Sequence, residues 1–295
     1  MTAVGARDTA PDRPALPAPD GDFVTVEGVR LHYRIIGRGP KAVALHGASG
    51  NLREWRAGPA AALTERATLL TLDRPGHGFS ERPTGGENIF VQARLLHRAA
   101  EALGFGAAPL IGHSMGGTVA LAWAVQQPQA VPGLLLISAP SQVWPGGTGL
   151  IYDLAATPGL GTALVHTLPR LMGDKLIADA LVRIFAPQSA PPGYAEKVAA
   201  KLALRPATAQ ANARDISRLK PLMRRMVPMY DRLTMPIELI HGEADKTVPL
   251  AIHSEPTEAL LPGARLTRLP GIGHMPHQVA PQAVLAALDR LLARL

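Results

Sequence analysis

Three side chains of this sequence have the types needed for nucleophilic chemistry: Ser114, Asp245 and His274. A serine hydroxyl attacks a carbonyl carbon readily only when a base takes its proton, and histidine is a common base for this step. The histidine in turn needs a carboxylate that orients its ring and stabilises its charged form. The three residues are far apart in the chain, so the elements around each of them must bring them together.

The residues around Ser114 predict a sharp turn between a strand and a helix. A short apolar run at 110–111 leads into Gly-His-Ser-Met-Gly at 112–116, and an alanine-rich helical pattern follows directly. The glycines at both ends of this motif have no Cβ atoms that could collide where the chain reverses. The start of the helix would present backbone N–H groups to a negative charge on a reacting oxygen. A glycine-rich corner without catalytic function would carry the same short motif.

Asp245 and His274 each come shortly after an apolar run that predicts a strand, at 237–240 and 265–269. Further strands are predicted at 23–26, 29–36, 41–45, 68–72 and 133–137, and helices at 51–66, 89–103, 250–261 and 276–295. This alternation predicts an α/β fold with a mostly parallel, eight-stranded sheet that is covered by helices on both faces. Parallel strands end on the same side of a sheet, so the three side chains are expected to meet there.

The alternation of strands and helices stops between residues 141 and 234. This segment contains prolines, glycines and helical pieces at 173–185 and 194–204, but no pair of strands. We therefore expect a helical cap insertion at 141–234 in a core domain formed by 22–140 and 235–295. Residues 1–21 contain four prolines and no apolar block, which predicts a flexible tail.

Composition limits the classes of function. The chain has 295 residues, of which 47% are hydrophobic and 18% are charged, and it has no cysteine, which excludes disulfides and thiolate metal sites. No signal peptide and no run of about 18 apolar residues is evident, so a cytoplasmic protein without stable membrane insertion is expected. The net charge is +7, and most of the excess lies in 141–234. This excess fits either a solvated surface or attraction for anions, and no motif indicates a nucleic-acid partner.

Five motifs together resemble those of the α/β-hydrolase superfamily, from about residue 23 to the end of the chain. The resemblance is to its serine-nucleophile branch, in which esterases, haloperoxidase-like enzymes and C–C hydrolases carry a helical cap. The five motifs occur in the order typical of the family: His46-Gly47, 73–80, 112–117, 242–245 and Gly273-His274.

The resemblance implies a role for each residue of the site. Ser114 would be the nucleophile, His274 the base and Asp245 the acid that orients it. The backbone N–H groups of Met115 and Ala48 would form the oxyanion hole. A serine as nucleophile argues against dehalogenase and epoxide hydrolase activities, whose families place an aspartate there.

Alternatives for some of these roles remain open. Glu243 is a second carboxylate near Asp245, and His241 with Asp245 could suggest a metal pair, although no convincing ligand cluster surrounds them. His46, His77 and His113 match family positions that usually serve as structural hydrogen-bonding groups.

The insertion combines apolar and basic side chains, which would suit a mid-sized apolar substrate. Methionine adapts to varied apolar shapes, although the methionines here could equally pack the insertion onto the core. The candidate pocket residues are Ser49, His113, Trp144, Met223, Met226 and His277.

The resemblance implies hydrolysis of a carboxylic ester through an acyl-enzyme intermediate. Hydrolysis of a C–C bond and cofactor-free perhydrolysis can use the same three residues, and a pocket that only binds a ligand is a further alternative. We expect a small-molecule substrate, no cofactor, no metal and a monomer or homodimer.

Overall fold

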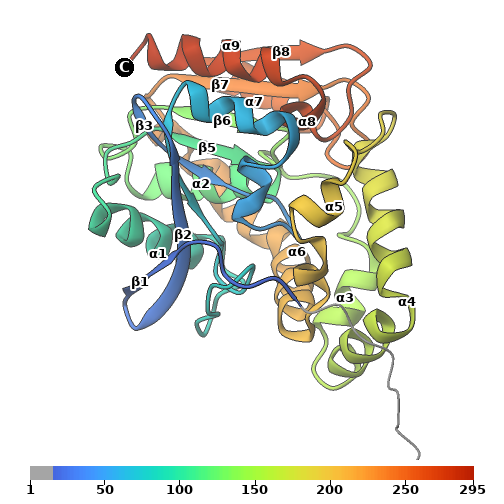
Figure 1. Cartoon of the computed structure of the whole chain (residues 1–295). Helices are drawn as coiled ribbons and strands as arrows, with labels where there is room; N and C mark the ends of the chain where they lie inside the picture. The colour runs from blue at the N-terminus through green and yellow to red at the C-terminus, as the bar shows by residue number, and fades with distance from the viewer. Residues whose placement is uncertain (1–15) are drawn as a thin grey trace, which may run out of the picture.

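The computed structural model describes residues 16–295; residues 1–15, which make up most of the expected flexible tail, lie outside the described part. An eight-stranded sheet with the order β1-β2-β4-β3-β5-β6-β7-β8 forms its centre (Figure 1). β2 pairs antiparallel with β1 and β4, and every other pair in the sheet is parallel. The predicted α/β class with a mostly parallel, eight-stranded sheet is therefore confirmed. The strands are β1 (Asp22–Val26), β2 (Val29–Gly37), β3 (Lys41–Leu45), β4 (Thr68–Leu72), β5 (Leu110–His113), β6 (Leu134–Ile137), β7 (Ile237–Gly242) and β8 (Ala264–Leu269).

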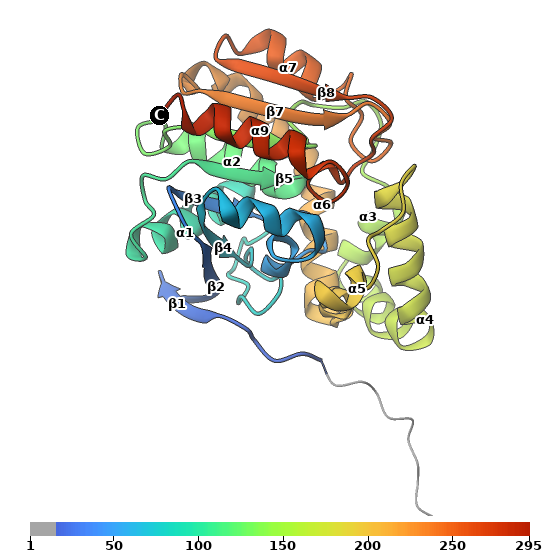
Figure 2. The same cartoon turned by 45° about the horizontal axis from the view of Figure 1, so that its top comes forward.

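Helices cover both faces of this sheet because its central strands are apolar on both sides. α1 (Ile89–Ala102) and α2 (Met115–Gln126) pack on one face, where Leu110 and Leu134 join their core. α9 (Pro281–Leu292) packs on the other face with Ile111 and Leu135. Figure 2 shows α9 in front of the sheet and α7 (Ser254–Leu260) on the far side of β8.

Two predicted helices differ from the observed ones at prolines and a glycine. The 51–66 segment forms two 3₁₀ helices, η1 (Leu52–Trp55) and η2 (Gly58–Glu65), and η2 begins at Gly58, which has a φ of 59°. The 276–295 segment is divided into α8 (Pro276–Val279) and α9, because the nitrogen of Pro281 cannot donate a helical hydrogen bond. α7 is also shorter than predicted.

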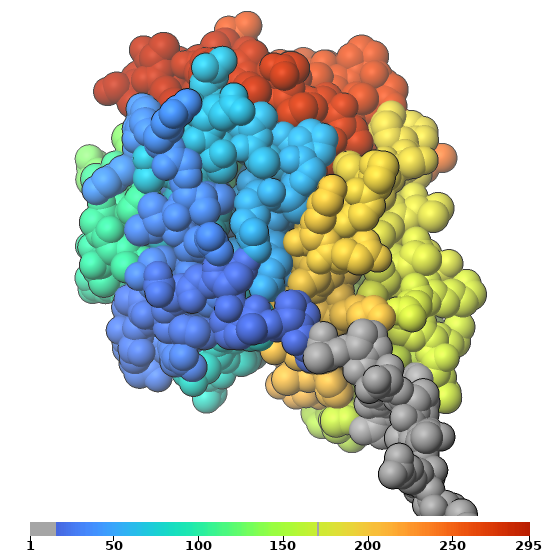
Figure 3. Space-filling view, in the orientation of Figure 1, coloured from blue at the N-terminus to red at the C-terminus, as the bar shows by residue number. Residues whose placement is uncertain are grey.

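The chain between β6 and β7 is helical, as the pattern of 141–234 predicted. α4 is longer than the predicted piece at 173–185, and α6 was not predicted. Figures 1 and 3 show these helices along the side of the core toward which β7 and β8 point. The helices are α3 (Leu150–Ala156), α4 (Leu160–Phe185), α5 (Tyr194–Lys197), η3 (Ala200–Leu204), α6 (Pro206–Met226) and η4 (Val227–Arg232).

α4 is the longest helix and is interrupted near its middle. Pro169 lies inside it, and Met172 has non-helical backbone angles (φ −137°, ψ 19°). A proline removes one helical hydrogen bond and crowds the preceding turn, which accounts for the kink. Neither α4 nor any other helix within residues 16–295 combines the length and apolar character needed to span a membrane.

Candidate active site

Ser114 occupies a strained turn between β5 and α2. Its φ of 51° and ψ of −125° lie outside the regions that non-glycine residues prefer, at a cost of about 1–3 kcal/mol. The flanking glycines make the turn possible. A Cβ on Gly112 would lie 2.5 Å from the Cα of Gly117, and a Cβ on Gly116 would lie 2.1 Å from the carbonyl oxygen of Leu45. The turn therefore packs too tightly against neighbouring backbone for any larger residue at either position.

The structure brings Ser114, His274 and Asp245 into one hydrogen-bonded row. The Oγ of Ser114 lies 3.0 Å from the Nε2 of His274, and the Nδ1 of His274 lies 2.7 Å from the Oδ2 of Asp245. The three residues follow β5, β8 and β7, so the carboxyl ends of three parallel strands of one sheet position them. All three are buried, with exposed fractions of 8%, 4% and 5%. This geometry allows the imidazole to take a proton from the hydroxyl.

The environment of this row sets its protonation states. Burial lowers the pKa of His274, although the neighbouring Asp245 carboxylate acts in the opposite direction. Burial by itself would raise the pKa of Asp245, but His241 and His274 hold this pKa well below its usual range. The Oδ1 of Asp245 also accepts hydrogen bonds from the backbone N–H groups of Thr247 and Val248, at 2.8 and 2.9 Å. A neutral imidazole beside a fixed carboxylate is the state that a general base requires.

Two backbone N–H groups near Ser114 are available to a negative oxygen. Within residues 16–295, neither the Met115 amide nor the Ala48 amide donates to a protein acceptor. Met115 is the first residue of α2, where helical N–H groups have no acceptor in the preceding turn. The loop that contains Ala48 passes close to the serine, since a Cβ on Gly47 would lie 3.3 Å from the Ser114 Cβ. These amides can therefore serve a tetrahedral intermediate at this site.

A buried arginine donates hydrogen bonds to the loop that contains Ala48. Arg74 donates from Nε to the carbonyl oxygen of His46 at 3.1 Å and from Nη2 to that of Gly47 at 3.2 Å. Its Nη1 donates to Asp215 of α6 at 3.1 Å, and the Nε2 of His77 lies 3.0 Å from the same carboxylate oxygen. The motif at 73–80 contains Arg74, but the contacts of Arg74 with this loop were not predicted from the sequence. Asp215, which stands in a segment without any motif, was not predicted either.

α6 also contacts this loop directly. The Ser49 amide donates to the Oδ1 of Asn212 at 2.8 Å. Asn212 and Asp215 are three residues apart, so they lie on one face of the helix. One turn of α6 therefore holds both the loop and the arginine that supports it. Ser49 itself lies in the loop with a φ of 55°.

The other predicted pocket residues lie in different surroundings. Met223 and Met226 are fully buried and pack α6 into the main core, which favours the packing role over a flexible pocket wall. Trp144 is half-buried, and its Nε1 donates to the carbonyl oxygen of Gly147 at 3.3 Å. Two surface hollows, one beside Lys41 and Phe105 and one at 20–22 and 33–35, contain none of the predicted site residues.

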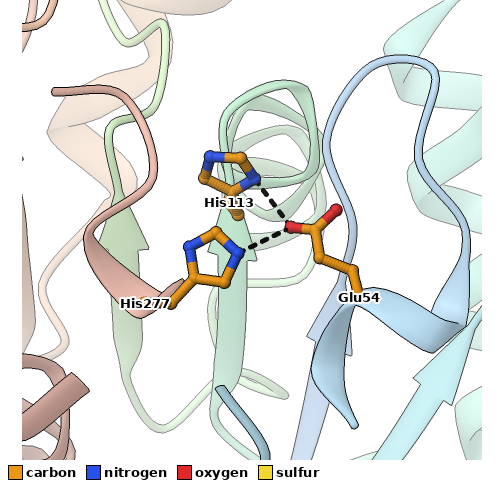
Figure 4. A group of neighbouring side chains, drawn as sticks. All are labelled: Glu54, His113 and His277. Atoms are coloured by element: carbon orange, nitrogen blue, oxygen red, sulfur yellow. Dashed lines mark ion pairs between the residues drawn. The ribbon is translucent and has the colours of Figure 1, made fainter. Parts of the chain in front are cut away.

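His113 and His277 lie next to each other in the protein interior and face the same oxygen of Glu54. The Oε1 of Glu54 is 2.7 Å from the Nδ1 of His113 and 3.1 Å from the Nε2 of His277 (Figure 4). All three side chains are buried, so neither histidine presents an open pocket surface. Glu54 was missed because one carboxylate within a predicted helix gives no sign that it is buried.

Among the described residues, Glu54, His113 and His277 are the group that could suggest a metal site. One ligand atom from each of them lies within 4.8 Å of the others. The 2.7 Å separation of the Glu54 oxygen from the His113 nitrogen is typical of a charge-assisted contact. Two ligands of a tetrahedral zinc ion would be about 3.3 Å apart, given bonds of about 2.0 Å. The contact is therefore shorter than joint zinc ligation requires.

Comparisons with known proteins agree with this architecture. A sequence profile described as alpha/beta hydrolase fold matches residues 43–281. An uncharacterized protein of Mycobacterium tuberculosis is 28% identical over 300 residues, covering 97% of this chain and 84% of that protein. Pimeloyl-(acyl-carrier protein) methyl ester esterase of Nitrosomonas europaea is 28% identical over 273 residues, covering 88% and 99%. The solved enol-lactonase of Burkholderia xenovorans LB400 has a TM-score of 0.72 at 23% identity, covering 92% and 100% of the two chains, which shows a shared fold.

Proposed function

Because this chain belongs to the alpha/beta hydrolase fold family, we propose that it is a serine hydrolase that cleaves a carboxylic ester through an acyl-enzyme intermediate. Membership in the family leaves the reaction open, since one fold supports many activities. The observation that carries the proposal is the row of hydrogen bonds from Ser114 through His274 to Asp245. This arrangement supplies a nucleophile, a base and the group that orients the base.

The first half of the reaction forms the acyl-enzyme. The Ser114 oxygen bonds to the ester carbonyl carbon while the Nε2 of His274 takes its proton. The carbonyl oxygen becomes an oxyanion, which the amides of Met115 and Ala48 stabilise. His274 then gives the proton to the leaving oxygen as its bond to the carbonyl carbon breaks, and an alcohol departs.

The second half releases the acid. A water molecule gives a proton to His274 and its oxygen bonds to the acyl carbon, which forms a second oxyanion at the same two amides. The bond from that carbon to the Ser114 oxygen then breaks, and the serine recovers its proton from His274. Asp245 keeps its charge throughout and stabilises the imidazolium in both halves.

Two of the similar proteins support an ester as the substrate. The Nitrosomonas europaea protein is named as a methyl ester esterase and the Burkholderia xenovorans protein as an enol-lactonase, and a lactone is a cyclic ester. We propose further that the 141–234 segment acts as a cap that selects a mid-sized apolar substrate. Its position beside the carboxyl ends of the strands supports this role.

Assays on the purified protein test the proposal. A panel of esters, thioesters, lactones and amides is assayed together with a ring-fission diketone and with peroxide. We expect the highest kcat/KM on an ester or lactone, and loss of that activity to near background in Ser114→Ala. Ser217→Ala is the matched control, because Ser217 lies on α6 and its hydroxyl donates to the Arg214 carbonyl.

Two outcomes contradict the proposal. Ester hydrolysis that is equal in Ser114→Ala and in Ser217→Ala would place the chemistry elsewhere. Turnover of the diketone well above that of every ester would favour C–C hydrolysis instead.

A further inference from the structure

Glu54, His113 and His277 come from three separate elements and meet in the protein interior. Glu54 belongs to η1, His113 ends β5 and His277 is in α8. Their exposed fractions are 5%, 3% and 0%. Burying a carboxylate is costly unless a positive charge or hydrogen-bond donors accompany it, so the two histidines beside Glu54 offset this cost.

His113 is the histidine whose contacts favour the protonated form most. Its Nε2 donates to the backbone carbonyl oxygen of His274 at 3.0 Å, and its Nδ1 lies 2.7 Å from Glu54. An imidazole that donates to a carbonyl oxygen with one nitrogen and lies at ion-pair distance from a carboxylate with the other is stabilised in the form with a proton on both. Burial lowers the pKa of His113, but Glu54 and the His274 carbonyl outweigh this effect and the pKa is raised overall.

The other two members complete the charge balance. Burial by itself would raise the pKa of Glu54, but the two histidines hold it well below its usual range. Burial and the charge of His113 lower the pKa of His277 to about 4. These shifts favour a trio of one carboxylate at Glu54, one imidazolium at His113 and one neutral imidazole at His277.

The protonated member lies directly against the base of the proposed reaction. The ring centroids of His113 and His274 are 5.1 Å apart, and those of His113 and His277 are 4.3 Å apart. We propose that Glu54, His113 and His277 form a positioning trio that fixes the backbone of His274 and keeps a positive charge beside its imidazole. The functional meaning of this trio depends on the proposed role of His274 as base.

Other titratable groups near the trio and His274 also influence the protonation of the His274 imidazole. Asp245 and His241 face His274 from the β7 side, and Asp245 favours the protonated form. His46 lies near the Glu54 carboxylate, and the buried Tyr194 is also within its electrostatic reach. The charge of His113 opposes the influence of Asp245 on His274. The trio therefore keeps the base unprotonated at a lower pH than Asp245 alone would allow.

The variant His113→Gln tests the trio, because an amide can still donate to the His274 carbonyl but carries no charge. NMR of the isotope-labelled imidazole nitrogens follows each histidine without any substrate. We expect the pKa of His274 to rise by about 0.5–2 units, since a full charge about 5 Å away is removed. The acid limb of kcat/KM on an ester should move upward by the same amount, with KM changed less than kcat.

A second variant and a matched control separate this effect from disturbed folding. Glu54→Gln combined with His113→Gln leaves a neutral pair, and it should also raise the pKa of His274. His97→Gln is the control, because His97 is another buried histidine beside a carboxylate, 3.7 Å from Glu101 on α1. Its replacement should leave the titration of His274 unchanged.

The outcomes are distinct from those that test the proposed function. In the native protein, His113 protonated on both nitrogens at neutral pH supports the trio even if no ester is hydrolysed. Three results would each overturn the trio. The first is an Nδ1 of His113 that carries no proton, and the second is a pKa of His274 that is unchanged or lowered in both variants. The third is a metal bound in stoichiometric amount to the native protein and lost in Glu54→Gln.

Discussion

Ser114 shows how a single residue can carry strain that its neighbours impose. Its positive φ is held by the hydrogen bond from its own N–H to the Ile137 carbonyl at 2.9 Å and by the two glycines beside it. The sequence predicted this turn because the glycine spacing expresses a steric requirement. It could not predict Glu54, since the burial of one carboxylate depends on histidines about 60 and 220 positions away in the chain.

The protonation of His274 gives a prediction about pH. The proposed base can take a proton only when it is neutral, and burial lowers the pKa of His274 below the ordinary value of 6.5. We therefore expect kcat/KM on the best ester to be constant near neutral pH and to fall on acidification with an apparent pKa below 6.5. Rates measured from about pH 4.5 to 9, corrected for spontaneous ester hydrolysis, check this expectation. An acid limb centred above pH 7 would contradict it.

At the scale of elements, the ends of strands position the site and α6 supports it. Each predicted strand is present within a few residues of its predicted bounds. α6 was missed in a segment rich in prolines and glycines, but Pro206 stands at the start of the helix, where its missing N–H costs nothing. The contacts of Asp215 were beyond sequence reasoning, since they cross about 140 residues of chain.

The ion pairs of α6 give a prediction about stability. Asp215 is buried and lies 3.1 Å from Arg74, 3.0 Å from His77 and 2.7 Å from Arg82. Asp215→Asn leaves the fully buried guanidinium of Arg74 without its carboxylate partner. The free energy of unfolding should therefore fall by about 3–5 kcal/mol.

Urea denaturation with a matched control checks this value. Asp174 also pairs with a basic residue, since it lies 2.8 Å from Lys201, but its side chain is 84% exposed. Asp174→Asn should change the free energy of unfolding by about 0.5 kcal/mol or less. Equal effects of the two substitutions would show that the buried pairs do not hold α6 to the core.

At the scale of the whole molecule, the core and the inserted helices contribute different parts of the proposed site. The core supplies the three side chains and the two backbone amides of the proposed site, while α6 packs its methionines into that core and contacts the loop that contains Ala48. The pocket and packing roles of Met223 and Met226 could not be separated from the sequence, because an apolar residue on a helix has the same sequence pattern whether it faces a ligand or a core. Substrate preference is therefore the property that the sequence predicts least.

Covalent labelling of the intact protein with an organophosphonate ester tests the central claim most directly. The reagent reacts with a serine oxygen that a neighbouring histidine activates, and it requires no knowledge of the natural substrate. We predict one adduct per chain by intact mass, located on Ser114 by peptide mapping and absent from Ser114→Ala. No adduct on the native protein, or an adduct that persists in Ser114→Ala, would contradict the account.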